Sequence, residues 1–148
     1  MKSLIVTLVG MVFLLTCNDA PEKPNKNTEV FSNYLRNQFQ TELPETPHRY
    51  LLLPAIYCKG CVQKYWMDLT QWGETNDHNL ITIITTQPKA IPDSISQQFE
   101  TRVDRSGMLD RLPLRVANLT ILKSENRNVY SVFSIPTTDT TYVGKLLE

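Results

Sequence analysis

The chain has 148 residues, which indicates a single domain with a modest hydrophobic core. Its 15 basic and 15 acidic residues balance, and the basic residues form no run that could follow a nucleic-acid backbone or an anionic lipid surface. We therefore expect no nucleic-acid partner, and the 41% of hydrophobic residues is typical of a globular domain.

The N-terminal segment is typical of an export signal. Lys2 precedes an apolar run over residues 4–15 that is too short to span a bilayer comfortably. The run ends in Leu-Leu-Thr-Cys at residues 14–17, which resembles the lipobox of bacterial lipoproteins. That resemblance implies a signal peptide over residues 1–16, a lipid on Cys17, and an exported protein anchored on the periplasmic or cell-surface side of a membrane. An uncleaved membrane anchor and an ordinary signal peptide are the alternatives.

Residues 17–27 predict a flexible tether, because Pro21 and Pro24 lie among polar residues with almost nothing apolar. The domain itself is expected over residues 28–148. It begins with a helix that Thr28 caps, and the apolar residues of this helix fall near one face. Those residues are Val30, Phe31, Tyr34, Leu35 and Phe39.

The next elements alternate between strands and helices before a hairpin, which indicates an α/β domain. We expect a buried strand at 49–53, a helix from Cys61 to near Gly73, an interior strand at 80–86, a short helix from Asp93, a brief strand at 102–104, a helical turn at 106–112, and a hairpin of 119–122 with 129–133. The helix from Cys61 has the clearest pattern. Its apolar residues Val62, Tyr65, Trp66 and Leu69 recur at the helical period, and with Trp72 they are expected in the core or at its rim.

The sequence Cys-Lys-Gly-Cys at residues 58–61 lies just at the start of that amphipathic helix. A helix N-terminus offers free amides and partial positive charge, which stabilise the thiolate that reacts in disulfide exchange. Lys59 adds a cation, and Gly60 is expected to let the backbone bend tightly. We expect Cys58 to be the exposed nucleophile and Cys61, one turn deeper, to be the resolving thiol. With Cys17 lipidated, these two cysteines are the remaining pair.

The element order over residues 28–135, with Tyr57 as the aromatic residue before the first cysteine, resembles the thioredoxin-like superfamily. The resemblance implies a three-layer α/β sandwich with a mixed central sheet and flanking helices. It also implies a thiol-disulfide oxidoreductase that exchanges disulfides with a protein or small-thiol partner. The family's cis-proline falls here at Ala117 or Asn118, and residues 136–148 leave little room for its closing helix. The strand at 49–53 lacks the buried acid of reductive members.

Other interpretations of the cysteine pair remain open. A structural disulfide would close a very small loop and so stabilise little, and it would leave a non-enzymatic interaction module. Zinc, or copper delivery, would need His48 or His78, and neither has a second ligand at typical spacing. Both histidines are expected in exposed loops, and Asp104 and Asp110 are expected to be solvated. We find no cofactor-binding motif and expect no metal.

If Cys17 carries the lipid, its replacement should change where the protein is found. The Cys17→Ser variant is expected to leave the membrane fraction, because the apolar run is too short to hold the chain there by itself. Fractionation followed by immunoblotting measures this. A variant that stays in the membrane would mean that the apolar segment itself is the anchor.

Overall fold

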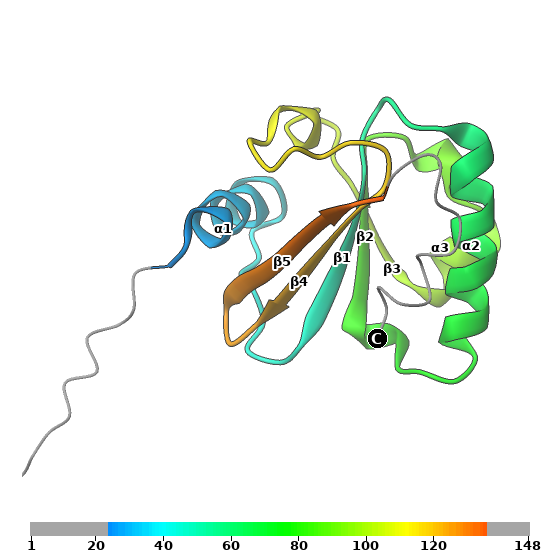
Figure 1. The fold of residues 1–148 in the computed structure, drawn as a ribbon, viewed down its shortest axis with the longest axis horizontal. Helices are drawn as coiled ribbons and strands as arrows, with labels where there is room; N and C mark the ends of the chain where they lie inside the picture. Colours follow the sequence, from blue (N-terminus) through cyan, green and yellow to red (C-terminus); the bar gives the residue numbers. More distant parts are fainter. Residues whose placement is uncertain (1–23, 136–148) are drawn as a thin grey trace, which may run out of the picture.

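A mixed five-stranded sheet forms the centre of the fold (Figure 1). The computed structural model describes residues 24–135, so Cys17 and the segment from residue 136 onward lie outside the described residues. The strands are β1 (His48–Leu53), β2 (Ile81–Thr85), β3 (Glu100–Val103), β4 (Thr120–Glu125) and β5 (Asn128–Ser134). They lie in the order β3-β2-β1-β4-β5, with β1, β2 and β3 parallel and β4 antiparallel to both β1 and β5.

Helices cover both faces of this sheet, which gives three layers. Helix α1 (Lys26–Phe39) lies on one face, and α2 (Lys59–Gly73) and α3 (Asp93–Gln98) lie on the other (Figure 1). Short 3₁₀ helices, η1 (His78–Leu80), η2 (Pro88–Ala90) and η3 (Leu109–Arg111), join the main elements. The expected α/β three-layer sandwich is confirmed, and its strand order is consistent with a thioredoxin-like fold.

The central strand β1 divides the hydrophobic core into two clusters. Alternate side chains of a strand point to opposite faces, so Leu51 and Leu53 pack with α2 and α3 while Tyr50 and Leu52 pack with α1. All four of these side chains are almost fully buried. Because both faces of β1 are covered, its position is fixed from both sides, and so is the loop that follows it.

Helix α1 begins at Lys26, inside the segment expected to be the tether, and its N-cap is Asn25 instead of Thr28. The Asn25 side chain accepts a hydrogen bond from the Thr28 backbone N–H at 2.9 Å and donates to the Val129 carbonyl at 2.7 Å. The Thr28 hydroxyl accepts from the Val129 N–H at 2.8 Å. The start of α1 therefore satisfies backbone groups of the edge strand β5, which joins the helix to the sheet.

The expectation that Asp104 is solvated was wrong: the residue is only 2% exposed. Its carboxylate accepts hydrogen bonds from the Tyr34 hydroxyl at 3.1 Å, the Ser106 hydroxyl at 2.6 Å and the Leu109 N–H at 2.7 Å. Burial alone would raise the pKa of Asp104, but these hydrogen bonds outweigh burial and hold that pKa below its ordinary value. Asp104 thus organises the chain that leaves β3.

His48 also differs from expectation, because it is the half-buried first residue of β1 instead of an exposed loop residue. Its Nε2 lies 2.9 Å from the Thr82 Oγ1, which in turn donates to a Glu100 carboxylate oxygen at 2.9 Å. Burial lowers the pKa of His48, and the neighbouring Glu100 opposes that effect. His78 is exposed in η1, as expected. Within residues 24–135, no helix has the length and apolar character that crossing a bilayer requires.

The Asp104 network predicts a pH-dependent stability. In Asp104→Asn, the new side-chain NH₂ group is a donor and faces donors that the carboxylate now accepts from. The substitution should therefore lower the free energy of unfolding by about 1–3 kcal/mol at pH 7. Because the folded-state pKa of Asp104 is lowered, its carboxylate stabilises the fold above about pH 4 and loses this effect below that pH. Urea unfolding of the wild type and of Asp104→Asn should show a smaller difference in the free energy of unfolding at pH 3 than at pH 7. An equal difference at both values would contradict this role.

Candidate redox-active site

The two cysteines of the predicted pair form a disulfide where the chain passes from β1 into α2. Strand β1 ends at Leu53, residues 54–57 form a loop, and Cys58 is the N-cap residue of α2. The Cα atoms of Cys58 and Cys61 lie 5.3 Å apart. The site therefore lies at the end of the sheet where the parallel strands β1, β2 and β3 finish.

The Cys58 sulfur acts as the capping group of α2. It accepts a hydrogen bond from the Cys61 backbone N–H at 3.3 Å, in the place where Ser or Asp side chains usually cap a helix. The Cys58 carbonyl accepts from the Val62 N–H at 3.0 Å. The first turn of α2 contains no acidic residue, so no carboxylate there offsets the positive end of the helix. This position favours a negatively charged sulfur.

The two sulfur-bearing residues do not show a simple contrast between exposed and buried. Cys58 and Cys61 are both half-buried, whereas Lys59 and Gly60 are exposed. Cys61 packs against the hydrophobic cluster on the α2 side of the sheet, and Tyr57 does so as well. Cys61 is thus held by the core, while the neighbouring turn is exposed to solvent.

Gly60 does not have the expected role. It lies inside the first turn of α2, and it is not among the residues with a positive φ angle. An added Cβ would meet none of the described atoms within 4 Å. The backbone there needs no glycine for a tight bend.

A groove flanks the disulfide on one side, next to the loop that precedes it. It has a volume of about 340 Å³ and is lined by Pro54, Ala55, Ile56, Asp110, Val116, Ala117 and Asn118. Ile56, two residues before Cys58, is 88% exposed. Asp110 is exposed, as expected, but its carboxylate accepts from the Ala55 N–H at 2.8 Å and so ties the loop to η3. We name this the Ile56 groove.

The predicted position of the family's cis-proline lies in this groove. Asn118, just before β4, has a positive φ of 52°, and the backbone over residues 24–135 contains no cis peptide bond. The Ile56 groove was not predicted from the sequence. An apolar residue between a proline and the cysteine motif is the signal that could have indicated it.

A second groove lies on the other side of the motif and has a volume of about 440 Å³. Its walls are the first two turns of α2 and the connection from β2 to α3, which a hydrogen bond of 3.1 Å from Trp66 Nε1 to the Ala90 carbonyl holds together. The lining residues are Tyr57, Lys59, Val62, Gln63, Trp66, Gln87, Lys89, Ala90 and Pro92. We name this the lysine groove.

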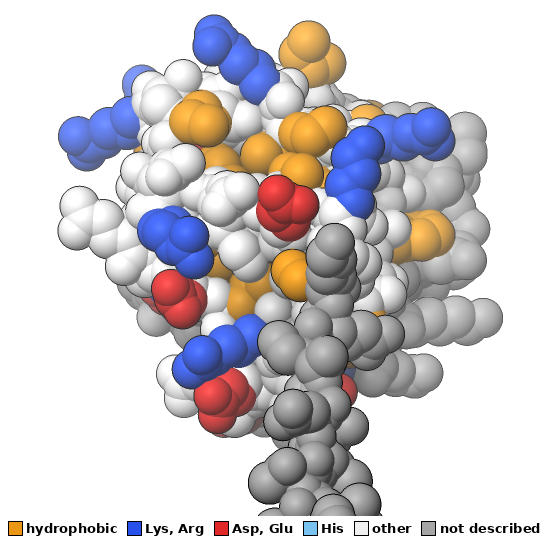
Figure 2. Space-filling model, turned by 90° about the vertical axis from the view of Figure 1, so that its left-hand side faces the viewer, with side chains coloured by type: hydrophobic (Ala, Val, Ile, Leu, Met, Phe, Trp, Pro, Cys, Tyr) orange, Lys and Arg blue, Asp and Glu red, His pale blue; other side chains and the backbone are white. Residues whose placement is uncertain are grey.

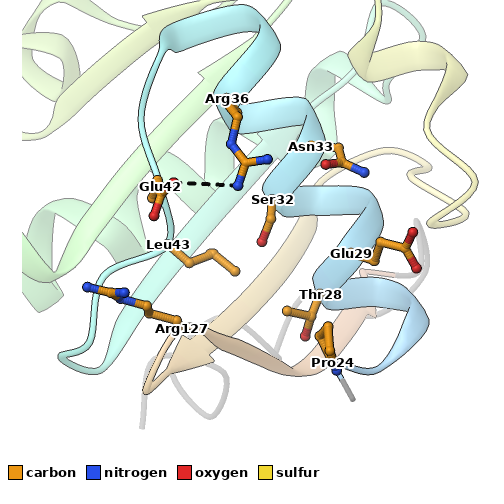
Figure 3. Close-up of a pocket in the computed structure, with 9 residues that line it drawn as sticks. All are labelled: Pro24, Thr28, Glu29, Ser32, Asn33, Arg36, Glu42, Leu43 and Arg127. Carbon is orange, nitrogen blue, oxygen red and sulfur yellow. Dashed lines mark hydrogen bonds and ion pairs between the residues drawn. The ribbon is translucent and has the colours of Figure 1, made fainter. Parts of the chain in front are cut away.

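A third groove lies on the opposite face of the sheet, beside α1. Its volume is about 300 Å³, and it is bordered by an ion pair of 3.4 Å between Arg36 and Glu42 (Figure 3). Seen from the α1 side, basic and acidic side chains lie interspersed (Figure 2). This face therefore shows no large patch of a single charge, and the groove is separated from the disulfide by the sheet.

The histidines do not join the cysteine pair. His48 begins β1 and Cys58 follows its end, so the strand separates them, and His78 lies in η1 before β2. Among residues 24–135, no group of three or more His, Cys, Asp or Glu side chains could hold a metal ion.

No family model, curated protein or solved structure matches the chain. The chemical interpretation of the site accordingly depends on its geometry: a disulfide that begins a helix, at the end of the central strand of a mixed sheet. A disulfide in this position is compatible with thiol-disulfide chemistry.

Proposed function

We propose that the protein is a thiol-disulfide oxidoreductase, exported and anchored through a lipid on Cys17, that exchanges disulfides with a protein partner. The observation that supports this most directly is the Cys58–Cys61 disulfide with Cys58 as the N-cap of α2. A purely structural bridge between these residues would close a very short loop, which stabilises a fold less than a long-range bridge does.

In the reducing direction, the Cys58 thiolate attacks one sulfur of a partner disulfide. A bond forms between Cys58 and that sulfur, and the other partner sulfur leaves as a thiolate. The Cys61 thiolate then attacks the Cys58 sulfur, which restores the Cys58–Cys61 bond and releases the second partner thiolate. Two electrons pass from the protein's dithiol to the partner, and the same steps run backwards when the protein oxidises a dithiol.

The helix N-terminus assists in both directions. The Cys61 N–H that points at the Cys58 sulfur stabilises this sulfur as the attacking thiolate in the reducing direction, and as the leaving thiolate when the partner's second thiol displaces it in the oxidising direction. Lys59 adds positive charge beside it. The buried carboxylate of Asp104 is held by Tyr34 on the α1 side of the sheet, so it does not take the Cys61 proton. Cys61 is half-buried, and water can accept that proton directly.

The Ile56 groove offers a partner an apolar contact next to the reacting sulfur. Ile56 is 88% exposed, and most of the other side chains that line the groove are apolar as well. A partner segment that covers it would remove apolar surface from water and hold the partner's disulfide beside Cys58.

The expected anchor also fits the fold. Asn25, which belongs to the segment proposed as the tether, donates a hydrogen bond to the Val129 carbonyl of β5 on the α1 side, whereas Cys58 is the N-cap of α2 on the other side (Figure 1). The chain thus enters the domain away from the disulfide. With a lipid on Cys17, this arrangement leaves the disulfide accessible to partners.

Removing the resolving cysteine should trap the partner. In Cys61→Ala, the mixed disulfide on Cys58 cannot be resolved within the site, so non-reducing gels of the host membranes should show a new band that disappears on reduction. Cys58→Ala serves as the matched control and should trap little, because Cys61 is packed against the core. Mass spectrometry of the band identifies the partner.

Equal trapping by the two variants would contradict the assigned roles of nucleophile and resolving thiol. No trapping by either variant, together with a native pair that does not react with thiols, would favour an interaction module in which the disulfide is structural.

A further inference from the structure

The lysine groove differs in charge from the Ile56 groove on the other side of the motif. Two exposed lysines, Lys59 and Lys89, line it from opposite walls, and no acidic residue is among its lining residues. In the Ile56 groove, the one acidic residue, Asp110, already accepts a hydrogen bond from the Ala55 N–H. The two sides of the disulfide therefore offer different chemistry: apolar on one side and cationic on the other.

The other charged residues near the lysine groove are not among the residues that line it. Asp93 follows Pro92 at the start of α3 and is exposed, and Lys64 and Asp68 lie on α2 outside the lining. The positive N-terminus of α2 reinforces the two lysines, since its first turn has no acidic residue. A negatively charged group is the ligand that this combination favours.

The floor of the groove is apolar and firmly held. Val62 and Trp66 of α2 are buried, with exposed fractions of 2% and 5%, and the hydrogen bond from Trp66 to Ala90 fixes the opposite wall. Gln63 and Gln87 add amide groups at the rim. This lining suits a short stretch of polypeptide that carries a carboxylate better than a bare anion, because the apolar floor contacts the carbon atoms of the ligand.

We propose that the lysine groove selects protein partners that carry Asp or Glu next to the cysteine that reacts with Cys58. This inference rests on the proposed oxidoreductase function and specifies its substrate class. The groove begins at Tyr57 and Lys59, the two chain neighbours of Cys58. A residue one or two positions from the partner's cysteine lies about 3–7 Å along an extended chain, which is enough to enter it.

Two peptide disulfides test this selection. Each is a symmetric dimer of a short peptide that contains one cysteine. The two peptides are identical except that Asp-Asp lies beside the cysteine in the first and Asn-Asn in the second. The reduced full-length protein, purified in detergent, transfers two electrons to each dimer and releases two peptide thiols, which chromatography quantifies. Each rate is divided by the rate at which dithiothreitol reduces the same peptide, because acidic neighbours change the intrinsic reactivity of a disulfide. The acidic peptide should react roughly threefold to tenfold faster at low ionic strength, and salt should reduce this preference.

Substitutions at Lys89 locate the preference in the groove without altering the helix tip that carries Cys58. Lys89→Gln should lower the ratio of the two rates toward one, and Lys89→Glu should lower it further, because a carboxylate then offsets Lys59 within the groove. Lys26→Gln makes the same charge change on α1, across the sheet, and should keep the wild-type ratio.

Equal normalised rates for the two peptides with the wild-type protein would overturn the acidic preference and leave the oxidoreductase function intact. A preference of undiminished size in Lys89→Glu would also overturn it, because reversing the charge of one of the two groove lysines must weaken a selection that the groove makes. A failure of the reduced protein to reduce either dimer, together with a failure of the oxidised protein to oxidise either peptide thiol, would contradict the proposed function as well as this inference.

Discussion

The first turn of α2 has free backbone amides, and the Cys58 sulfur lies where one of them, the Cys61 N–H, points. A sulfur in this position caps the helix when it is bonded and is stabilised as an anion when it is free. The same contact therefore serves the fold and the chemistry. A serine would cap the helix equally well, but it would provide no disulfide exchange.

The location of this contact depends on β1. Leu51 and Leu53 are buried under α2, and Leu52 is buried under α1, so a slip of the strand by one residue would move each leucine into the cluster on the other face and disrupt the packing of both. The loop that follows begins at the buried Pro54 and is tied to η3 by the Asp110 carboxylate. Two hydrophobic clusters and one hydrogen bond thus hold the cysteines at the end of the central strand, between an apolar groove and a cationic one.

The sequence predicted the periodic elements well and the buried polar residues poorly. Helix α2 followed from its apolar repeat, and Val62 and Leu69 are indeed buried. The predicted exposure of Asp104 was wrong because its burial depends on Tyr34, which is 70 positions away along the chain. The predicted exposure of His48 was wrong because its position depends on Thr82, 34 positions away. Local sequence patterns do not predict contacts between residues so far apart along the chain. The grooves were missed for the same reason: each is built from segments far apart in the sequence.

The reduction potential of the Cys58–Cys61 pair tests the central claim most directly. It is measured by equilibrating the purified full-length protein with dithiothreitol or glutathione redox buffers and alkylating the free thiols. A pair that exchanges disulfides at a helix N-terminus should have a potential above about −300 mV, because stabilising the thiolate favours the reduced form. A potential clearly below about −300 mV would mark a structural bond and contradict the oxidoreductase account.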